Sequence, residues 1–433
     1  METNGELARI KQDILKGVQR YFARHHEWSA AAPNRVPLSI PGYGEEEVCE
    51  ALDALLSGDV TMGARVRRFE VSFADYIGVK HAIMVNSGSS ANLIALSILV
   101  HPSLRGRIVR GDEILVPAIP WSTTVFPILQ VGALPVFVDV RLDTYNVDMD
   151  QLRAAVTPRT RAIMVVHLLG NPVDMDAVHA LAQERGLIVI EDACEAHGAL
   201  VRGRKVGSFG DLATFSFFFS HHISTIEGGM VLTNNDEYAD LARSLRAHGW
   251  IREMQTRDRI ASQYGEFDSR FLFVSAGYNL RPTEIQGAFG IHQLARLEPF
   301  IELRRENARF WNQHLKKYAD SLVTQEEAEG TRHVWFGYPV FVRPDAPFTR
   351  TSLAQYLAGC AIETRPIMAG NVAQQPVMQL YEYRQAGPLP NAQLIARNAF
   401  LFGNHQGVGP QQREYVARCV DDFMSRVPKR SVR

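Results

Sequence analysis

The sequence predicts an α/β protein with a mostly parallel central sheet and a smaller C-terminal α+β domain, for three reasons. Between about residues 80 and 235, short apolar runs alternate with amphipathic stretches, as expected when strands alternate with helices. The apolar runs are nearly continuous in Val, Ile and Leu, which is typical of strands buried on both faces. From about residue 320, strand-like and helix-like segments follow one another without that alternation.

Seven apolar runs are the expected strands of the larger domain. They are 81–86, 113–118, 134–140, 161–167, 187–192, 212–218 and 230–234. Helical spacing of apolar residues is expected at 90–100, 149–156 and 173–186, and the segment 236–310 is expected to be mostly helical. Within it, the polar stretch 254–273 is expected to be a loop. In the tail, the expected elements are a strand at 333–342 and helices at 351–360 and 411–424.

Three parts are expected along the chain. They are an N-terminal helical extension (1–34), a large domain (35–310) and a small C-terminal domain (311–433). The first segment has apolar residues at helical spacing and charges throughout, so it lacks the apolar core of a signal peptide. No run of about 18 apolar residues occurs, so no membrane span is expected.

Composition limits the function classes. The formal net charge is −1 with mixed signs, which does not favour an electrostatic nucleic-acid binder. The four cysteines are scattered and form no C-x-x-C pair, so no metal site is expected. Without a disulfide framework, we expect a reducing cytoplasmic location.

The stretch MVNSGSSANLIAL places small residues between a strand and a helix. Ser87, Gly88 and Ser89 follow the strand, and a helix is expected to start near Ser90. A helix N-terminus presents unpaired N–H groups and a positive dipole end, and small residues let a phosphate approach. The alternative is an ordinary serine N-cap without a ligand.

Two further strand ends carry candidate ligand-binding residues. Glu191 and Asp192 end an apolar run, and ligands of open α/β sheets bind at the carboxyl ends of strands. A carboxylate there can pair with a cationic ring nitrogen, although a capping or ion-paired acid is the alternative. Trp121 follows another strand, where an indole can stack on a planar ligand or simply fill a gap under a loop.

The segment ATFSFFFSHHISTIEGGMVLTN combines a strand, a polar turn and a second strand. Ser216 lies where its hydroxyl can reach a phosphate, and His221 and His222 lie in the turn. Glu227 is followed by two glycines that allow a tight turn. His197 in EDACEAHGA is either a ligand contact or a buried structural histidine.

The order of these segments resembles the DegT/DnrJ/EryC1/StrS family over about residues 35–425. The matching stretches are SGSSANL, EDACEAHGA, FSF followed by EGG, GYNLRPTEIQGAFG and IETRPIMAGN. The resemblance implies the aspartate-aminotransferase fold (fold type I) and a pyridoxal phosphate (PLP) cofactor. It also implies a homodimer in which Asn279 reaches the phosphate in the partner subunit.

The resemblance implies a role for each candidate residue. Trp121 would stack on the cofactor ring, and Asp192 would keep its pyridine nitrogen protonated. The residues expected to hold the phosphate are Gly88, Ser89, Ser90 and Ser216. For His197, His222 and Glu363, contact with the substrate or cofactor is weighed against local packing or, for Glu363, an exposed acid.

His221 departs from the usual pattern of the family, in which its position carries the lysine that binds PLP as a Schiff base. No lysine lies between Lys205 and Lys316, so none replaces it by a small shift of register. Imidazole cannot form an imine, but its ordinary pKa of about 6.5 suits proton transfer. The sequence therefore predicts PLP or pyridoxamine phosphate held without a covalent bond, and His221 as the catalytic acid and base.

Histidine at this position resembles the 3-dehydratase branch of the family. That branch removes the C3 hydroxyl of nucleotide-linked 4-keto-6-deoxyhexoses, and GDP-4-keto-6-deoxy-D-mannose is the expected substrate. One sub-branch holds an iron–sulfur cluster, which Cys360 and Cys419 are too isolated to bind. The other takes its amino group from L-glutamate and releases a 4-keto-3,6-dideoxy sugar and ammonia.

Three alternatives remain open from the sequence. The first is a sugar aminotransferase that uses an unusual lysine. The second is a non-catalytic PLP-binding regulatory protein. The third is a lysine-free enzyme that acts on another keto substrate.

Overall fold

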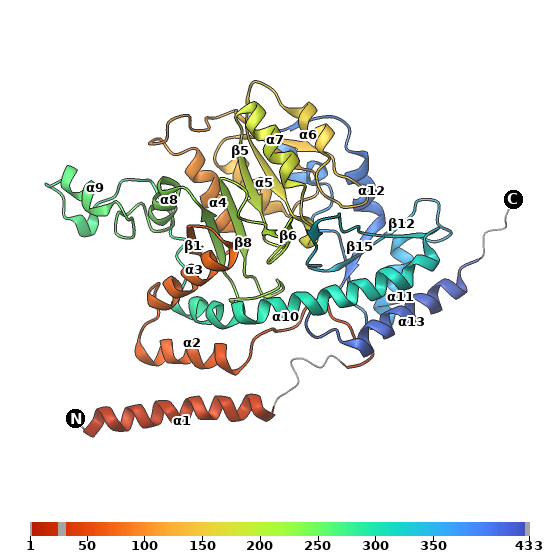
Figure 1. Ribbon diagram of the computed structural model, residues 1–433, viewed down its shortest axis with the longest axis horizontal. Helices are drawn as coiled ribbons and strands as arrows, with labels where there is room; N and C mark the ends of the chain where they lie inside the picture. Colours follow the sequence, from red (N-terminus) through yellow and green to blue (C-terminus); the bar gives the residue numbers. More distant parts are fainter. Residues whose placement is uncertain (1, 25–31, 429–433) are drawn as a thin grey trace. The chain divides into compact units, whose positions relative to one another are not determined.

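The computed structural model describes residues 2–24 and 32–428 (Figure 1). Its described residues form two compact units. The first unit comprises Met1–His26, Pro41–Ile108 and Gly207–Leu297, and the second comprises Glu27–Ile40, Val109–Val206 and Glu298–Arg433. Within the described ranges, none of the helices is long and apolar enough to cross a membrane. The three-part division expected from the sequence stays a prediction.

The first unit contains three strands in the order β1–β9–β8. The strands are β1 (His81–Val85), β9 (Gly229–Thr233) and β8 (Leu212–Ser216), and β9 is antiparallel to both neighbours. The connection 217–228 between β8 and β9 contains no helix, whereas a parallel crossover usually contains one. All three strands were predicted from their apolar runs.

Helices cover these strands. Helix α4 (Gly88–Leu99) packs on β8 and β9, and α3 (Ala64–Ile77) packs on β1. The described remainder of the unit contributes α1 (Glu2–Arg24), α2 (Glu45–Ser57), α8 (Asp236–Arg246), α9 (Arg257–Gln263), the 3-10 turn Ser269–Phe271 and the start of α10 (Glu284–Leu315).

An aromatic cluster fixes the end of β8. Phe215 and Phe217 both contact Phe73 edge to face, with ring centroids 5.1 and 5.2 Å apart, and Phe217 also contacts Phe69 at 5.1 Å. All four rings are fully buried. Because side chains alternate along a strand, Ser216 between the two phenylalanines points to the opposite face.

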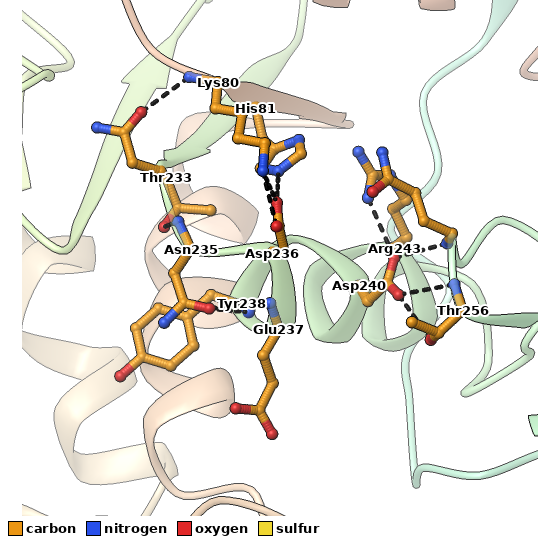
Figure 2. A network of polar contacts seen from close by, with 12 residues as sticks. Lys80, His81, Thr233, Asn235, Asp236, Glu237, Tyr238, Asp240, Arg243 and Thr256 are labelled. Atoms are coloured by element: carbon orange, nitrogen blue, oxygen red, sulfur yellow. Dashed lines mark hydrogen bonds and ion pairs between the residues drawn. The ribbon is translucent and has the colours of Figure 1, made fainter. Parts of the chain in front are cut away.

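Helix α8 is capped and anchored by polar contacts (Figure 2). Asn235 is its N-cap, and its side-chain oxygen accepts the N–H groups of Glu237 and Tyr238 at 2.9 and 3.2 Å. Asp236 in the first turn pairs with the Lys80 amine at 2.7 Å and the His81 ring at 2.6 Å. These contacts tie the start of β1 to the start of α8.

One turn later, Asp240 anchors the segment that follows. Its carboxylate accepts the N–H of Gln255 at 2.7 Å and both the N–H and the hydroxyl of Thr256 (Figure 2). The segment 236–310 was expected to be mostly helical with a loop at 254–273; between residues 247 and 283 the helical pieces described are α9 and a single 3-10 turn, and both lie inside that expected loop. A Cβ on Gly249 would lie only 1.8 Å from the Ser275 carbonyl, so the chain crosses itself too closely here for a continuous helix.

The second unit contains a parallel sheet in the order β5–β4–β2–β3–β14. The strands are β5 (Ile188–Asp192), β4 (Thr160–Val166), β2 (Glu113–Pro117), β3 (Leu134–Val138) and β14 (Arg384–Gln385). Its helices include α5 (Ser122–Gln130), α6 (Met149–Ala155) and α7 (Met175–Arg185). The alternation predicted from the sequence is confirmed.

The second unit also holds the C-terminal α+β region. An antiparallel sheet has the order β10–β12–β15–β13. The elements are β10 (Leu322–Thr324), β12 (Tyr338–Val342), β15 (Ala399–Phe402), β13 (Thr364–Pro366), α11 (Arg350–Gly359), α12 (Pro390–Asn398) and α13 (Pro410–Arg426). A small sheet β11–β6–β7 joins Thr331–Arg332, Leu200–Val201 and Arg204–Lys205. The strand expected at 333–342 starts only at Tyr338, because Trp335 has a left-handed φ of 49°.

Candidate active site

Three chain segments meet at one edge of the β1–β9–β8 sheet. Gly229, the first residue of β9, lies opposite Val85 at the end of β1 and opposite Ser216 at the end of β8. The loop that begins at Asn86 and the turn that contains His221 both leave from this edge. The predicted phosphate-binding residues and the predicted catalytic histidine therefore belong to one local structure.

Two glycines are required by the closeness of these segments. A Cβ on Gly88 would lie 2.4 Å from the Ser216 Cβ and 2.8 Å from its hydroxyl oxygen. A Cβ on Gly229 would lie 2.2 Å from the Ser87 carbonyl oxygen. The Ser216 hydroxyl is thereby placed directly at the N-terminus of α4.

Ser87 is the N-cap of α4, as the alternative interpretation of this loop required. Its hydroxyl oxygen accepts the N–H of Ser90 at 3.1 Å. The Ser90 hydroxyl lies 2.6 Å from the side-chain oxygen of Asn86 and 2.9 Å from that of Ser87. The Ser90 side chain thus belongs to the loop's own hydrogen bonds, whereas Ser89 is exposed at the first turn of the helix.

His221 is half-buried and His222 is buried with 1% exposure. The His221 N–H donates to the Phe218 carbonyl at 3.0 Å, which closes a tight turn directly after β8. Further along, the Thr225 N–H donates to the Phe217 carbonyl at 2.9 Å. The His221 ring is therefore carried by a short turn fixed at both ends.

The sequence did not predict which residues hold this turn in place through hydrogen bonds. The side-chain oxygen of Gln293, a fully buried residue of α10, accepts the Ser224 N–H at 3.0 Å. Its amide donates to Glu47 at 2.8 Å and to the Gly42 carbonyl at 2.9 Å. A polar pair at Glu47 and Gln293 has no local signal in the sequence, because the two residues meet only in the folded chain.

Two lysines of the first unit, Lys80 and Lys11, are engaged elsewhere. Lys80 pairs with Asp236 at the start of β1. The loop from Asn86 to Ser90, called the serine loop below, follows the end of this five-residue strand. Such a strand is about 17 Å long, so the Lys80 amine lies far from His221. Lys11 on α1 pairs with Asp53 at 2.6 Å.

Asp192 ends β5 in the second unit and is 5% exposed. One carboxylate oxygen accepts the Thr124 hydroxyl proton at 2.7 Å, and the other accepts the Cys194 N–H at 3.2 Å. These donors fix the orientation of the carboxylate. Thr124 was not predicted, since nothing in the sequence shows that α5 starts beside the end of β5.

Trp121 precedes α5 and is 55% exposed. An indole this open is not packed into a core, so the gap-filling alternative is not what the structure shows. A planar ring can stack on it at this end of the parallel sheet.

Further acids and histidines lie in the segments next to this strand end. Burial raises the pKa of Glu195 to about 8, and the negative charge of Asp192 adds to the rise, although the Leu169 N–H donates to its carboxylate at 2.7 Å. His167 accepts the Val173 N–H through Nδ1 at 3.0 Å, so its Nε2 carries the proton facing Glu191 at 3.1 Å. His197 is fully buried.

Glu363 and Asn279 have defined contacts. Glu363 accepts the Leu38 N–H at 3.1 Å and lies 3.8 Å from Arg35, so it binds the segment before α2. Asn279 is exposed, and its side-chain oxygen accepts a hydrogen bond from Arg281 at 3.0 Å. The next residue, Leu280, accepts the Asn86 N–H at 3.0 Å, which places this segment beside the serine loop of its own chain.

The residues present fit PLP. The small residues and the α4 N-terminus suit a phosphate group. Gly88, which packs against Ser216, has no side chain that could block the phosphate. Asp192 suits a protonated pyridine nitrogen, and the open Trp121 indole suits the ring. The roles of the individual site residues stay predictions.

This fold and these residues define an enzyme of the PLP-dependent aspartate-aminotransferase type. The chain belongs to the DegT/DnrJ/EryC1/StrS aminotransferase family, whose model matches residues 41–421. A GDP-4-keto-6-deoxy-D-mannose 3-dehydratase of Yersinia pseudotuberculosis is 39% identical, covering 86% of this chain and 94% of the relative. A dTDP-4-dehydro-2,6-dideoxy-D-glucose 3-dehydratase of Saccharopolyspora spinosa is 37% identical, covering 96% and 92%.

Solved structures give the same result. The E. coli GDP-4-keto-6-deoxy-D-mannose-3-dehydratase with bound hydrated PLP aligns with a TM-score of 0.84 at 36% identity, covering 89% of this chain and 99% of that chain. A GDP-4-keto-6-deoxymannose-3-dehydratase with a trapped PLP-glutamate geminal diamine aligns with a TM-score of 0.83 at 36% identity, covering 89% and 100%. The predicted family and fold class are confirmed.

Proposed function

We propose that this protein is a PLP-dependent 3-dehydratase that removes the C3 hydroxyl of a nucleotide-linked 4-keto-6-deoxyhexose, with L-glutamate as the amino donor. The reaction class predicted from the sequence is confirmed by the relatives, which include 3-dehydratases of GDP- and dTDP-linked sugars. A 4-keto-3,6-dideoxy sugar and ammonia are the proposed products. GDP is the proposed nucleotide, because the relative with 39% identity is named for a GDP-linked sugar.

The observation that carries the proposal is His221 in the turn after Ser216. In that turn a lysine would bind the cofactor covalently, and the Lys80 and Lys11 amines of the first unit are held by Asp236 and Asp53. An imidazole there keeps proton transfer and loses the covalent bond. This combination favours dehydration over ordinary transamination.

The chain's own residues then have separate tasks. Ser216 and the first turn of α4, from Gly88 to Ser90, bind the phosphate group, and Trp121 supports the ring. Asp192 holds a proton on the ring nitrogen. PLP, when bound, supplies an electron sink for the bond changes at the sugar. Neutral His221 accepts a proton, and its protonated form then delivers one to the departing C3 hydroxyl oxygen.

We further propose a homodimer in which Asn279 contributes to the partner's phosphate site. Exposed aromatic residues on the segment after α8 support a subunit contact, because large exposed apolar patches on proteins commonly mark interaction sites. These residues are Tyr264, Phe267, Phe271 and Phe273, which are 43–64% exposed. A cytoplasmic location also stays a prediction.

The test is a substrate panel with the purified protein, PLP and L-glutamate. GDP-, CDP- and dTDP-linked 4-keto-6-deoxyhexoses are supplied in turn, and ammonia release and the loss of water from the sugar are measured. We expect both from one member of the panel, with GDP favoured. A 4-amino sugar without ammonia release would show an aminotransferase instead, and no reaction with any sugar would support a non-catalytic protein.

A further inference from the structure

Helix α1 contacts the first unit with one face. Lys11 lies 2.6 Å from Asp53 and 2.8 Å from the Ser57 hydroxyl, both on α2. The Cys49 thiol of α2 lies 3.8 Å from the Leu15 carbonyl oxygen of α1. Lys11 and Leu15 are half-buried, so α1 is held as a formed helix against α2.

A second face of α1 is apolar and exposed. Leu7, Ile10, Ile14 and Tyr21 are 63%, 49%, 42% and 49% exposed. Their spacing of three, four and seven residues is that of the a and d positions of a coiled coil, with Gly17 at the remaining d position. An apolar seam two heptads long is therefore presented to solvent on a helix that is already folded.

The charges beside the apolar seam differ between its two halves. With Leu7 at an a position, Glu6, Asp13 and Arg20 lie at the g positions that flank the seam, whereas Arg9 and Lys16 lie at outward c positions. Lys11 lies at an e position and is held by Asp53. An antiparallel pair places Glu6 of each helix near Arg20 of the other, which opposite charges favour, and the two Asp13 side chains form its one like-charge contact.

We infer that this seam, defined by Leu7, Ile10, Ile14 and Tyr21, pairs antiparallel with the same seam of a second copy of the chain. A two-fold axis makes such a contact self-complementary. Glu6 then lies near Arg20 of the second copy, and Asp13, midway between positions 6 and 20, lies beside the axis. The cost of forming an isolated short helix does not oppose the pairing, because α2 already supports α1.

Disulfide cross-linking tests the inference on the full-length chain with Cys49→Ser as background. Asp13→Cys is expected to give a covalent dimer under mild oxidation at least ten times faster than Gln12→Cys, which is also exposed but faces away from the seam. A mixture of Glu6→Cys and Arg20→Cys chains is expected to form the mixed dimer faster than Glu6→Cys alone. Intact mass spectrometry distinguishes the products.

A double change on the seam supplies the control. Ile10→Glu with Ile14→Glu is expected to lower the Asp13→Cys cross-linking rate at least tenfold while circular dichroism and dehydration stay unchanged, because both side chains are exposed in the single chain. Equal rates for Asp13→Cys and Gln12→Cys would overturn the inference. So would binding of the unmodified protein to anionic lipid vesicles that the double change abolishes, since the seam would then face lipid.

Discussion

The edge of the β1–β9–β8 sheet and the end of β5 both carry predicted PLP-binding residues, but they are built differently. At the first edge, position is set by backbone closeness, since Gly88 and Gly229 have no room for a Cβ beside Ser216 and Ser87. At the end of β5, position is set by hydrogen bonds to a buried carboxylate, with Thr124 and Cys194 donating to Asp192. Steric space determines which residues fit in the first region, and the buried charge of Asp192 determines them in the second.

This difference predicts how each region responds to change. Added side-chain volume in the serine loop should lower stability and weaken PLP binding even when no functional group is changed. Isosteric loss of charge at the β5 end should lower turnover without disturbing the fold. His221 is the exception in the first region, since its proposed role is chemical.

The largest expected effect is from His221→Asn. Removing an acid–base group that acts in the rate-limiting chemistry lowers turnover by about 10²- to 10⁴-fold. We expect that loss in ammonia release, with PLP binding retained. The matched change His222→Asn should lower stability but keep turnover in the folded protein, because His222 is buried. Wild-type turnover in His221→Asn would exclude His221 as the proton carrier.

Asp192→Asn should rank second. An opposite charge near a titrating nitrogen shifts its pKa by about one to three units, so its removal should lower turnover roughly 10- to 1,000-fold. Thr124→Val removes one hydrogen bond to this carboxylate. We expect it to weaken PLP binding or raise the activation free energy by only about 1–2 kcal/mol. Absorbance titration with PLP and steady-state rates separate the two, and a larger effect from Thr124→Val would contradict the assigned order.

Gly88→Ala tests the role of space. The new methyl group would lie 2.4 Å from the Ser216 Cβ, so we expect a loss of about 1–3 kcal/mol in the free energy of unfolding and weaker PLP binding. Gly265→Ala in the same unit is the control, because a Cβ added at Gly265 would have no other atom within 4 Å. Urea unfolding of both variants gives the comparison, and equal stability would show that the loop relaxes freely.

The smallest expected effect concerns Glu195, whose pKa is raised to about 8 from 4.5, first by burial and then by Asp192. Between these values the folded protein holds a proton that the unfolded chain releases, so stability from this group falls as pH rises. The slope is at most about 1.4 kcal/mol per pH unit.

Glu195→Gln should remove that slope. Unfolding of the wild type and the variant is compared at about pH 6.5 and 7.5, and exposed Glu184→Gln should leave the slope unchanged. A wild-type stability that rises with pH relative to Glu195→Gln would show that Glu195 is ionised in the folded protein.

Sequence patterns predicted the strands well, because each buried run is local: 187–192 was expected and β5 spans Ile188–Asp192. They also predicted the helix after Ser87. They did not predict that the Gln293 side chain holds the histidine turn or that Thr124 orients Asp192, since those contacts join residues 69 and 68 positions apart. They did not predict the short helix α9 inside the expected loop 254–273, since none of its residues is buried and it therefore lacks an apolar face.

Borohydride reduction of the wild-type protein with bound PLP, followed by denaturing mass spectrometry, tests the role of His221 most directly. We predict that the chain keeps its unmodified mass, whereas His221→Lys gains a covalently attached, reduced cofactor and loses dehydration. A wild-type chain that carries the reduced cofactor on any side chain would contradict the proposal that PLP is held without a covalent bond and that the His221 imidazole transfers the protons.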